Sequence, residues 1–242
     1  MKILITNDDG IDSPILPLLV QYARRFGEVT VVAPKVEQSG KSQALEFRNE
    51  IEIKRTDRFP NVEAWVVDST PADCVRFGVT GLKRSYDLVL SGINRGYNLG
   101  DDIVYSGTIG AIMEGARLGI RGLALSAEHH AFLSSVEELD RVADFFRTHD
   151  LFAYNDLYNV NIPPRVQGIS ITRQGRMYFS DDFEYRGNDR YLQVGAPVVE
   201  PVTDRGVDID AIHSDLISIT PLSFSRTNLP AFERLRDELT EV

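Results

Sequence analysis

The sequence predicts an α/β fold: a doubly wound, mainly parallel, Rossmann-like sheet, followed by a C-terminal extension of antiparallel hairpin strands and helix. Two observations lead to this prediction. Short β-branched runs alternate with amphipathic helical segments over residues 1–165, beginning with a strand, a helix and a strand within the first 34 residues. Beyond Pro164 the pattern changes to short strand-like pieces separated by polar loops.

The first strand, helix and strand define the direction of the sheet. Residues 3–5 form a short apolar run that ends at a cluster of turn-forming residues. Ser13 is expected to cap a helix that has Pro14 at its first position, and Gly27 is expected to end it in a left-handed conformation. Residues 29–33 are the next β-branched run. Because a strand–helix–strand connection of this length joins parallel strands, the unit predicts a parallel sheet.

The same alternation continues as far as residue 162. Further strands are expected at residues 62–67, 87–90, 122–126 and 157–162. The helices between them are expected at residues 71–80, 107–118 and 135–148, and Ser135 with Glu138 has the spacing of a capping box. The C-terminal part is expected to contain short strands at residues 169–172, 191–194 and 216–220 and a closing helix at residues 231–239.

Length and charge restrict the domain organisation and the class of partner. A chain of 242 residues is long enough for one large domain or two small ones, at ~100–200 residues per domain. We expect a catalytic core at residues 1–165 and an extension at 166–242 that belongs to the same domain and serves oligomerisation. The formal net charge is −10, and residues 181–242 carry 13 acidic and 6 basic side chains. Nucleic acid is not expected as a stable partner, because its phosphates require a basic face.

The single cysteine and the apolar runs indicate the compartment. Cys74 is the single cysteine of the sequence, which excludes a disulfide scaffold and a cysteine-rich zinc module. The N-terminal apolar run is shorter than the ~7–15 residues of a signal-peptide core. No apolar run approaches the ~20 residues that span a bilayer. We therefore expect a cytoplasmic protein without a membrane partner.

The first candidate site residues follow the first predicted strand, at the edge where open α/β sheets bind ligands. Asp8 and Asp9 are adjacent there, and two neighbouring carboxylates repel each other. A divalent cation such as Mg²⁺ or Mn²⁺ removes this repulsion and prefers oxygen ligands. Residues 7–10 also have the composition of an ordinary turn, so this segment alone fits either interpretation.

Further candidate residues follow other strands of the same sheet. The loop at residues 91–98 has two glycines and two asparagines, and Asn94 and Asn98 offer amide oxygens to a metal or N–H groups to a phosphate. Ser39 adds a hydroxyl group beyond the second strand. Alone, each of these segments is also typical of an ordinary loop.

A helix is expected to begin at the same edge. Ser106, Gly107 and Thr108 precede or open it, and the free N–H groups of a helix N-terminus suit a phosphate. Ser106 alone is also typical of a helix cap. Because the acidic pair, the Asn/Gly loop and the helix start all fall at one edge of one sheet, together they predict a metal-dependent phosphate site.

The same segments resemble a known family. ITNDDGI near the N-terminus, AP at 33–34 with Ser39 behind it, TPADCV at 70–75, SGINRGYN at 91–98 and YSGTIGAIMEG at 105–115 resemble the SurE family. The resemblance extends in order and spacing over about residues 1–130. The family consists of metal-dependent nucleoside monophosphate phosphatases, so the resemblance implies a 5′/3′-nucleotidase that releases nucleoside and phosphate.

The resemblance also implies roles for individual residues and a mode of assembly. The implied ligands of one Mg²⁺ or Mn²⁺ ion per subunit are Asp8, Asp9, Ser39 and Asn94. The implied phosphate-binding residues are Asn98, Ser106, Gly107 and Thr108. The implied assembly is a homodimer or homotetramer with C-terminal segments exchanged or packed between subunits.

The candidate residues leave the catalytic route open. We assign catalysis to Asp8, Asp9, Asn98 and Ser106. A water activated at the metal can attack phosphorus in line, with Asp8 or Asp9 as a base, and a covalent intermediate on Asp8 or Ser106 is the alternative. Burst kinetics distinguish the two routes.

Two other classes of protein place aspartates after a first strand. A haloacid-dehalogenase-like phosphatase acts through an Asp nucleophile, but its two aspartates stand two residues apart, whereas Asp8 and Asp9 are adjacent. A receiver-like signalling domain binds Mg²⁺ without being an enzyme, but it has about half this length and needs an acceptor Asp after a later strand. Both remain as alternatives to a nucleotidase.

Overall fold

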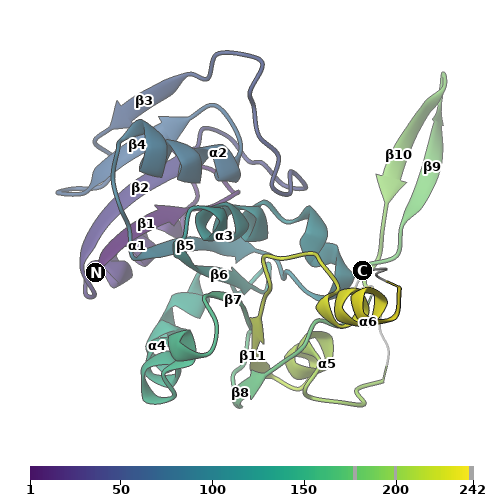
Figure 1. Cartoon of the computed structure of the whole chain (residues 1–242). Helices are drawn as coiled ribbons and strands as arrows, with labels where there is room; N and C mark the ends of the chain where they lie inside the picture. Colours follow the sequence, from purple (N-terminus) through teal and green to yellow (C-terminus); the bar gives the residue numbers. More distant parts are fainter. Residues whose placement is uncertain (177–178, 199–200, 240–242) are drawn as a thin grey trace.

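A nine-stranded sheet forms the centre of the structure, a computed structural model that describes residues 1–176, 179–198 and 201–239. The strand order is β3-β4-β2-β1-β5-β6-β7-β11-β8, which runs from top to bottom in Figure 1. The pairs β3–β4 and β7–β11 are antiparallel, and the other neighbouring strands are parallel. The strands are β1 (Lys2–Thr6), β2 (Glu28–Pro34), β3 (Ile53–Thr56), β4 (Glu63–Val67), β5 (Leu88–Arg95), β6 (Arg121–Ala127), β7 (Leu157–Ile162), β8 (Gly168–Ile171) and β11 (Leu216–Pro221).

The helices connect these strands across both faces of the sheet. The α-helices are α1 (Leu16–Ala23), α2 (Pro71–Arg76), α3 (Gly107–Arg117), α4 (Leu139–Thr148), α5 (Asp208–His213) and α6 (Leu229–Leu239). Short turns of other helix types are η1 (Phe77–Gly81), η2 (Gly100–Tyr105), η3 (Ser134–Glu138) and η4 (Leu151–Ala153). None of the helices in the described ranges is long and apolar enough to cross a bilayer.

Two hydrophobic cores divide the helices between the faces. Helices α1 and α4 pack on one face, through side chains such as Leu19 and Phe146. Helices α2 and α3 pack on the other, through side chains such as Val75 and Ile112. The connections β5–α3–β6 and β6–α4–β7 step in the same direction along the sheet but cross opposite faces, so they have opposite hands. Connections between parallel strands nearly always have the same hand. The connection through α4 has the opposite hand to the one through α3, and it therefore places α4 on the same face as α1.

The doubly wound, mainly parallel sheet confirms the predicted fold class, and a hairpin of β9 (Asp182–Gly187) and β10 (Arg190–Val194) supplies the antiparallel part of the extension. Figure 1 shows this hairpin projecting from the body of the molecule. Residues beyond 165 also contribute β8 and β11 to the central sheet. The division into a core and an extension at residue 165 stays a prediction.

Three local predictions from the sequence are wrong. Helix α1 begins at Leu16 with Ile15 in the cap position, so Ser13 is not its cap, and the helix ends before Gly27. Ser135 lies in η3 and donates to the carbonyl of Phe132, so it does not form a capping box for α4. Before both α1 and α4 the chain makes a tight turn. The side chain of Ser13 is buried in the first turn, and that of Ser135 is bonded within the second.

The third difference concerns residues 91–98, which were expected to be a loop. Strand β5 continues through this segment as far as Arg95, and its register with β6 shifts between Ser91 and Asn94. Gly92 has a φ of 132°, and a Cβ atom there would lie 2.3 Å from the carbonyl oxygen of Leu125. The glycine therefore permits an irregular strand to approach its neighbour, where the sequence indicates a turn.

Asp210 in α5 provides a test of how the C-terminal region is stabilised. Its Oδ2 atom accepts hydrogen bonds from the backbone N–H groups of Thr203 (2.9 Å) and Asp204 (2.8 Å). Burial raises the pKa of Asp210, but these N–H donors outweigh it and hold the pKa below its ordinary value. A carboxylate with a lowered pKa in the folded state stabilises the protein above its unfolded pKa of about 4, and this contribution is lost as the pH falls.

We therefore expect Asp210→Ala to lower the free energy of unfolding by about 1–3 kcal/mol at pH 7 and by less at pH 3. Urea denaturation at both pH values measures the difference. The control is Asp57→Ala, because Asp57 is exposed and has no hydrogen bond or ion pair to the rest of the described chain. An equal loss for Asp210→Ala at both pH values would contradict the role of its charge.

Candidate metal and phosphate site

The turn after β1 holds the acidic pair in a fixed position. Asn7 is fully buried, and its amide nitrogen donates to the carbonyl oxygen of Gly10 at 2.9 Å, while the N–H of Gly10 donates to its Oδ1. Gly10 has a φ of 91°, a conformation that favours glycine. Asn7 and Gly10 thus close the turn from both ends, which fixes Asp8 and Asp9 between them at the carboxyl end of the sheet.

Asp8 is held against the N-terminus of α3. Its side chain is 4% exposed, and Oδ1 accepts from the Thr108 hydroxyl group at 2.6 Å while Oδ2 accepts from the Thr108 N–H at 3.2 Å. A Cβ atom at Gly107 would lie 2.9 Å from the Cβ of Asp8, so the glycine allows the helix to come this close. Burial raises the pKa of Asp8, although both hydrogen bonds from Thr108 act to lower it.

Asp9 is more open than Asp8 and faces the end of β5. Its Oδ2 atom accepts from the backbone N–H of Arg95 at 3.3 Å. Burial, followed by the charge of Asp8, raises the pKa of Asp9 to about 6. The charge of Glu37 raises the pKa of both aspartates further. Three carboxyl groups therefore concentrate negative potential at this edge, which is an arrangement that attracts a cation.

The loop after β2 lies against the acidic pair. The N–H of Gln38 donates to the backbone oxygen of Asp8 at 2.7 Å, which brings the neighbouring Ser39 to this edge. The Ser39 side chain is exposed, and its hydroxyl group donates to Glu37 at 2.7 Å. Ser39 therefore lies in the loop that contacts Asp8, with its side chain in contact with Glu37.

Asn94 is presented by the irregular end of β5. Its Nδ2 atom donates to the carbonyl oxygen of Gly96 at 2.8 Å, which orients the amide group. The next residue, Arg95, contacts Asp9 through its N–H group. Asn94 and Asp9 are thus neighbours at the ends of adjacent strands, as expected for two groups that face one ligand.

Asn98 is anchored by a group of buried polar residues that the sequence reasoning did not assign to the site. Its backbone N–H donates to Asn161, and its backbone oxygen accepts from Asn159 and Asn161 at 2.9 and 2.8 Å. Its side-chain Nδ2 donates to Ser126 at 2.7 Å. The signal that could have found these residues is the polar side chains of Asn159 and Asn161 alternating with apolar ones in a fully buried strand.

The predicted helix start lies where it was expected. Ser106 is the N-cap of α3, and its Oγ accepts from the N–H of Ile109 at 3.2 Å. Gly107 and Thr108 form the first turn of the helix and are buried. The hydroxyl group of Thr108 is bonded to Asp8, so Thr108 connects the phosphate-binding residues to the acidic pair. The phosphate contacts of Ser106, Gly107 and Thr108 stay predictions.

The donor chemistry of these residues fits a hard divalent cation. The four expected ligands offer carboxylate, hydroxyl and amide oxygens, which Mg²⁺ and Mn²⁺ prefer. No group of three or more His, Cys, Asp and Glu side chains in the described residues is arranged to hold a metal. Two of the four expected ligands are carboxylates, and the other two are a hydroxyl and an amide group. Burial raises the pKa of both aspartates, and nearby negative charges, from Glu37 on both and from Asp8 on Asp9, raise it further. A bound cation would oppose these effects by favouring the charged carboxylates.

The fold and the site together define an α/β protein with an adjacent aspartate pair, of which Asp8 is buried, and a helix N-terminus at the carboxyl edge of its sheet. A family model described as "Survival protein SurE" matches residues 3–181. The 5′-nucleotidase SurE of Syntrophotalea carbinolica is 40% identical over 97% of this chain and 96% of its own length. The 5′-nucleotidase SurE of Legionella pneumophila is 34% identical over 100% of this chain and 98% of its own. The chain therefore belongs to the SurE family.

A solved structure agrees with this assignment. The crystal structure of the SurE protein from Aquifex aeolicus matches with a TM-score of 0.78 and 30% sequence identity. The match covers 98% of this chain and 99% of the other. The likeness therefore includes the C-terminal segments as well as the parallel core.

The contact between Thr108 and Asp8 gives a first test of the site. We expect Thr108→Val to lower the free energy of unfolding by about 1.5–3 kcal/mol, because it removes a hydrogen bond to a buried carboxylate. Thr108→Ser keeps the hydroxyl group and is the matched control. Urea denaturation at neutral pH in EDTA measures both variants, and equal stability of the two would mean that the hydroxyl group does not support Asp8.

Proposed function

We propose that this protein is a divalent-cation-dependent phosphomonoesterase that hydrolyses nucleoside 5′-monophosphates, and also 3′-monophosphates, to nucleoside and phosphate. The observation that carries the proposal is the aspartate pair beside the N-terminus of α3, where Thr108 joins the two parts of the site. The names of the curated relatives, 5′-nucleotidase SurE, support the choice of substrate.

The metal ligands in this proposal are Asp8, Asp9, Ser39 and Asn94, with one Mg²⁺ or Mn²⁺ ion per subunit. When bound, such an ion supplies charge neutralisation at phosphate oxygens and lowers the pKa of a coordinated water. Asp8 is positioned for this role by Thr108, and Asp9 by the N–H of Arg95. The pKa of both aspartates is raised, so either of them can serve as the base that takes a proton from the attacking water.

The phosphate group is proposed to lie at the N-terminus of α3. Ser106 is the N-cap, and Gly107 and Thr108 open the first turn, where the helix dipole favours an anion. The amide nitrogen of Asn98 carries two hydrogens, of which one is used by Ser126, so the second is free to donate to a phosphate oxygen. The anchoring of Asn98 by Asn159 and Asn161 would keep this donor in a fixed position.

The activity is tested by phosphate release from a panel of nucleoside 5′- and 3′-monophosphates. We expect release with Mn²⁺ or Mg²⁺ and a loss of activity in EDTA that is reversed when the cation is restored. Asp8→Asn should lower kcat/KM by more than the roughly 10–100-fold that loss of a residue supporting a metal ligand costs. Activity that survives thorough chelation would reject the proposed cation dependence. No phosphate release from any phosphomonoester would reject the proposed phosphomonoesterase activity.

The matched control for Asp8→Asn is Asp57→Asn, which removes one exposed carboxylate far from the site in sequence. We expect this control to leave kcat/KM unchanged. Circular dichroism and the melting temperature of Asp8→Asn separate a loss of chemistry from a loss of fold.

We also propose that the protein forms a homodimer or homotetramer through its C-terminal segments. No described residue of α6 is buried, and its apolar side chains Leu229, Phe232, Leu235 and Leu239 recur at helical spacing. The β9–β10 hairpin exposes Phe183, Tyr185 and Tyr191 by 60% or more. Apolar side chains on projecting elements are typical of surfaces that another subunit covers.

Light scattering after size-exclusion chromatography tests the assembly. We expect the unchanged protein to have two or four times the monomer mass of 27.1 kDa, and Phe232→Gln with Leu235→Gln to shift the mass towards the monomer. Arg234→Gln with Asp237→Gln changes the opposite side of α6 and should leave the mass unchanged. A monomeric unchanged protein would reject the proposal.

A further inference from the structure

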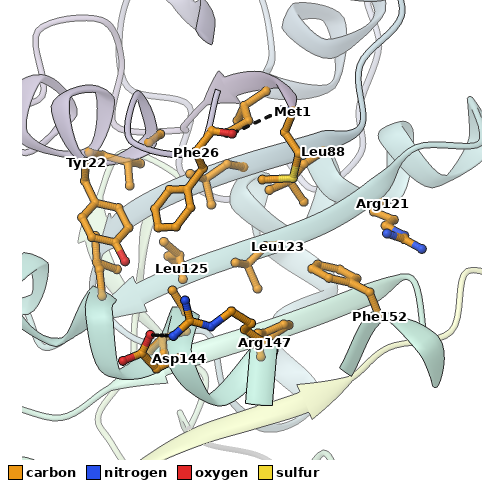
Figure 2. A pocket seen from close by; sticks show the side chains of 18 of the residues that line it. Met1, Tyr22, Phe26, Leu88, Arg121, Leu123, Leu125, Asp144, Arg147 and Phe152 are labelled. Atoms are coloured by element: carbon orange, nitrogen blue, oxygen red, sulfur yellow. Dashed lines mark hydrogen bonds and ion pairs between the residues drawn. The ribbon is translucent and has the colours of Figure 1, made fainter. Parts of the chain in front are cut away.

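A pocket of about 330 Å³ opens between α1 and α4 on the sheet face that both helices cover. Figure 2 shows that side chains from three directions face it: Tyr22 and Phe26 at α1, Leu123 and Leu125 on β6, and Phe152 after α4. Leu88 at the start of β5 completes the inner surface. The inner surface is therefore almost entirely hydrocarbon, with the tyrosine ring at one side.

The pocket follows from the topology of the sheet. Helix α1 belongs to the β1–β2 connection and α4 to the β6–β7 connection, so the two helices flank β5. The helix of the β5–β6 connection, α3, lies on the opposite face. The strip of sheet between α1 and α4 is thus left without a helix of its own, and Leu123 remains only half-buried there.

The pocket is separate from the acidic site. Leu88 and Arg121 are the first residues of β5 and β6, so this end of the pocket lies at the amino ends of the parallel strands. Asp8 and Asp9 follow the carboxyl end of β1. A ligand in the pocket would therefore occupy a different place from the proposed nucleotide.

The charged groups at the rim indicate the charge of the ligand. Arg147 pairs with Asp144 at 2.8 Å, and Arg121 pairs with Asp156 at 3.4 Å while its guanidinium group lies 5.2 Å from the centre of the Phe152 ring. Both arginines that line the pocket therefore already have a carboxylate partner. Asp150, the remaining acid at the rim, opposes an anion. The arginines and the N-terminal ammonium group of Met1, which donates to the carbonyl oxygen of Phe26 at 3.2 Å, oppose a cation. These rim charges favour a neutral ligand.

The hydrocarbon surface indicates the polarity of the ligand. A nucleobase or sugar has several donors and acceptors, and burial against Leu88, Leu123 and Leu125 would leave them unpaired at a cost. An apolar ring system loses nothing in this way and gains from leaving water. An apolar cavity of ~150 Å³ is enough to hold benzene, so this pocket has room for about two rings.

We propose that the pocket between α1 and α4 is a binding site for a small uncharged apolar molecule of one or two fused rings. Its ligand packs between Phe26 and Phe152 over the leucines of β5 and β6. Because it contacts both helices, the ligand joins two parts of the chain that are far apart in sequence.

Naphthalene, 2-naphthoate and 2-naphthylmethylammonium provide a matched test of charge. We expect ligand-observed NMR to give naphthalene a Kd at least ~10-fold lower than either charged analogue, because burying a charge without a partner is costly. Adenosine should not compete. A charged analogue that binds as tightly as naphthalene, or competition by adenosine, would overturn the proposal.

Ala143 lines the pocket on α4, and Ala143→Phe is designed to fill it. We expect naphthalene binding to weaken by at least ~10-fold, because the new ring takes the ligand's space. Ala153→Phe is the control, since Ala153 is exposed and lies in η4 outside the pocket lining. Equal affinity in both variants would overturn the proposal. A change of oligomer mass in Ala143→Phe alone would assign the pocket to a subunit contact instead.

A direct measurement covers the case in which Ala143→Phe fails to fold. Crystals of the unchanged protein soaked with 2-bromonaphthalene should show an anomalous bromine peak between α1 and α4. A peak only elsewhere on the protein, or none at saturating ligand, would reject the site.

Discussion

The contact between Asp8 and the N-terminus of α3 is the constraint on which the site depends. A carboxylate that is almost fully buried needs strong donors, and Thr108 provides two from one residue, its N–H and its hydroxyl group. The positive end of the helix dipole adds to this stabilisation. Because Asp8 follows the central strand β1, the same contact fixes α3 over the carboxyl edge of the sheet. The positive end of the α3 dipole therefore lies beside the acidic pair.

A separate group of buried polar residues supports Asn98, the proposed phosphate ligand. Asn98 is held through its backbone and its side chain by Asn159, Asn161 and Ser126, which belong to β7 and β6. Buried polar groups of this kind are costly unless they are paired, so their presence in the strands indicates a structural task. Here the task is to hold a loop residue at the edge of the sheet with the rigidity of the strands themselves.

The sequence predicted the strands well where a buried β-branched run identifies them, as in residues 29–33 and 157–162. It predicted the position of α3 because Ser106 and Gly107 are typical of a helix start, and in the structure they are the N-cap and the first residue of that helix. It was wrong at Ser13 and Ser135, since a cap-forming residue also suits the turn that precedes a helix. The strand β9 was not predicted, although Phe183 and Tyr185 alternate with charged side chains in the way that is typical of a strand. The partnership of Asp8 with Thr108 spans 100 residues and has no local signal.

The opposite hands of the connections through α3 and α4 have a consequence for synthesis on the ribosome. Helix α1 is complete when residue 23 has been made, but α4, which covers the same sheet face, ends only at residue 148. Until then the apolar residues of β6 on that face, such as Leu125, lack the helix that shares a core with them in the folded protein. A nascent chain therefore exposes apolar surface on this sheet face until α4 has been made, and such surface promotes aggregation during folding.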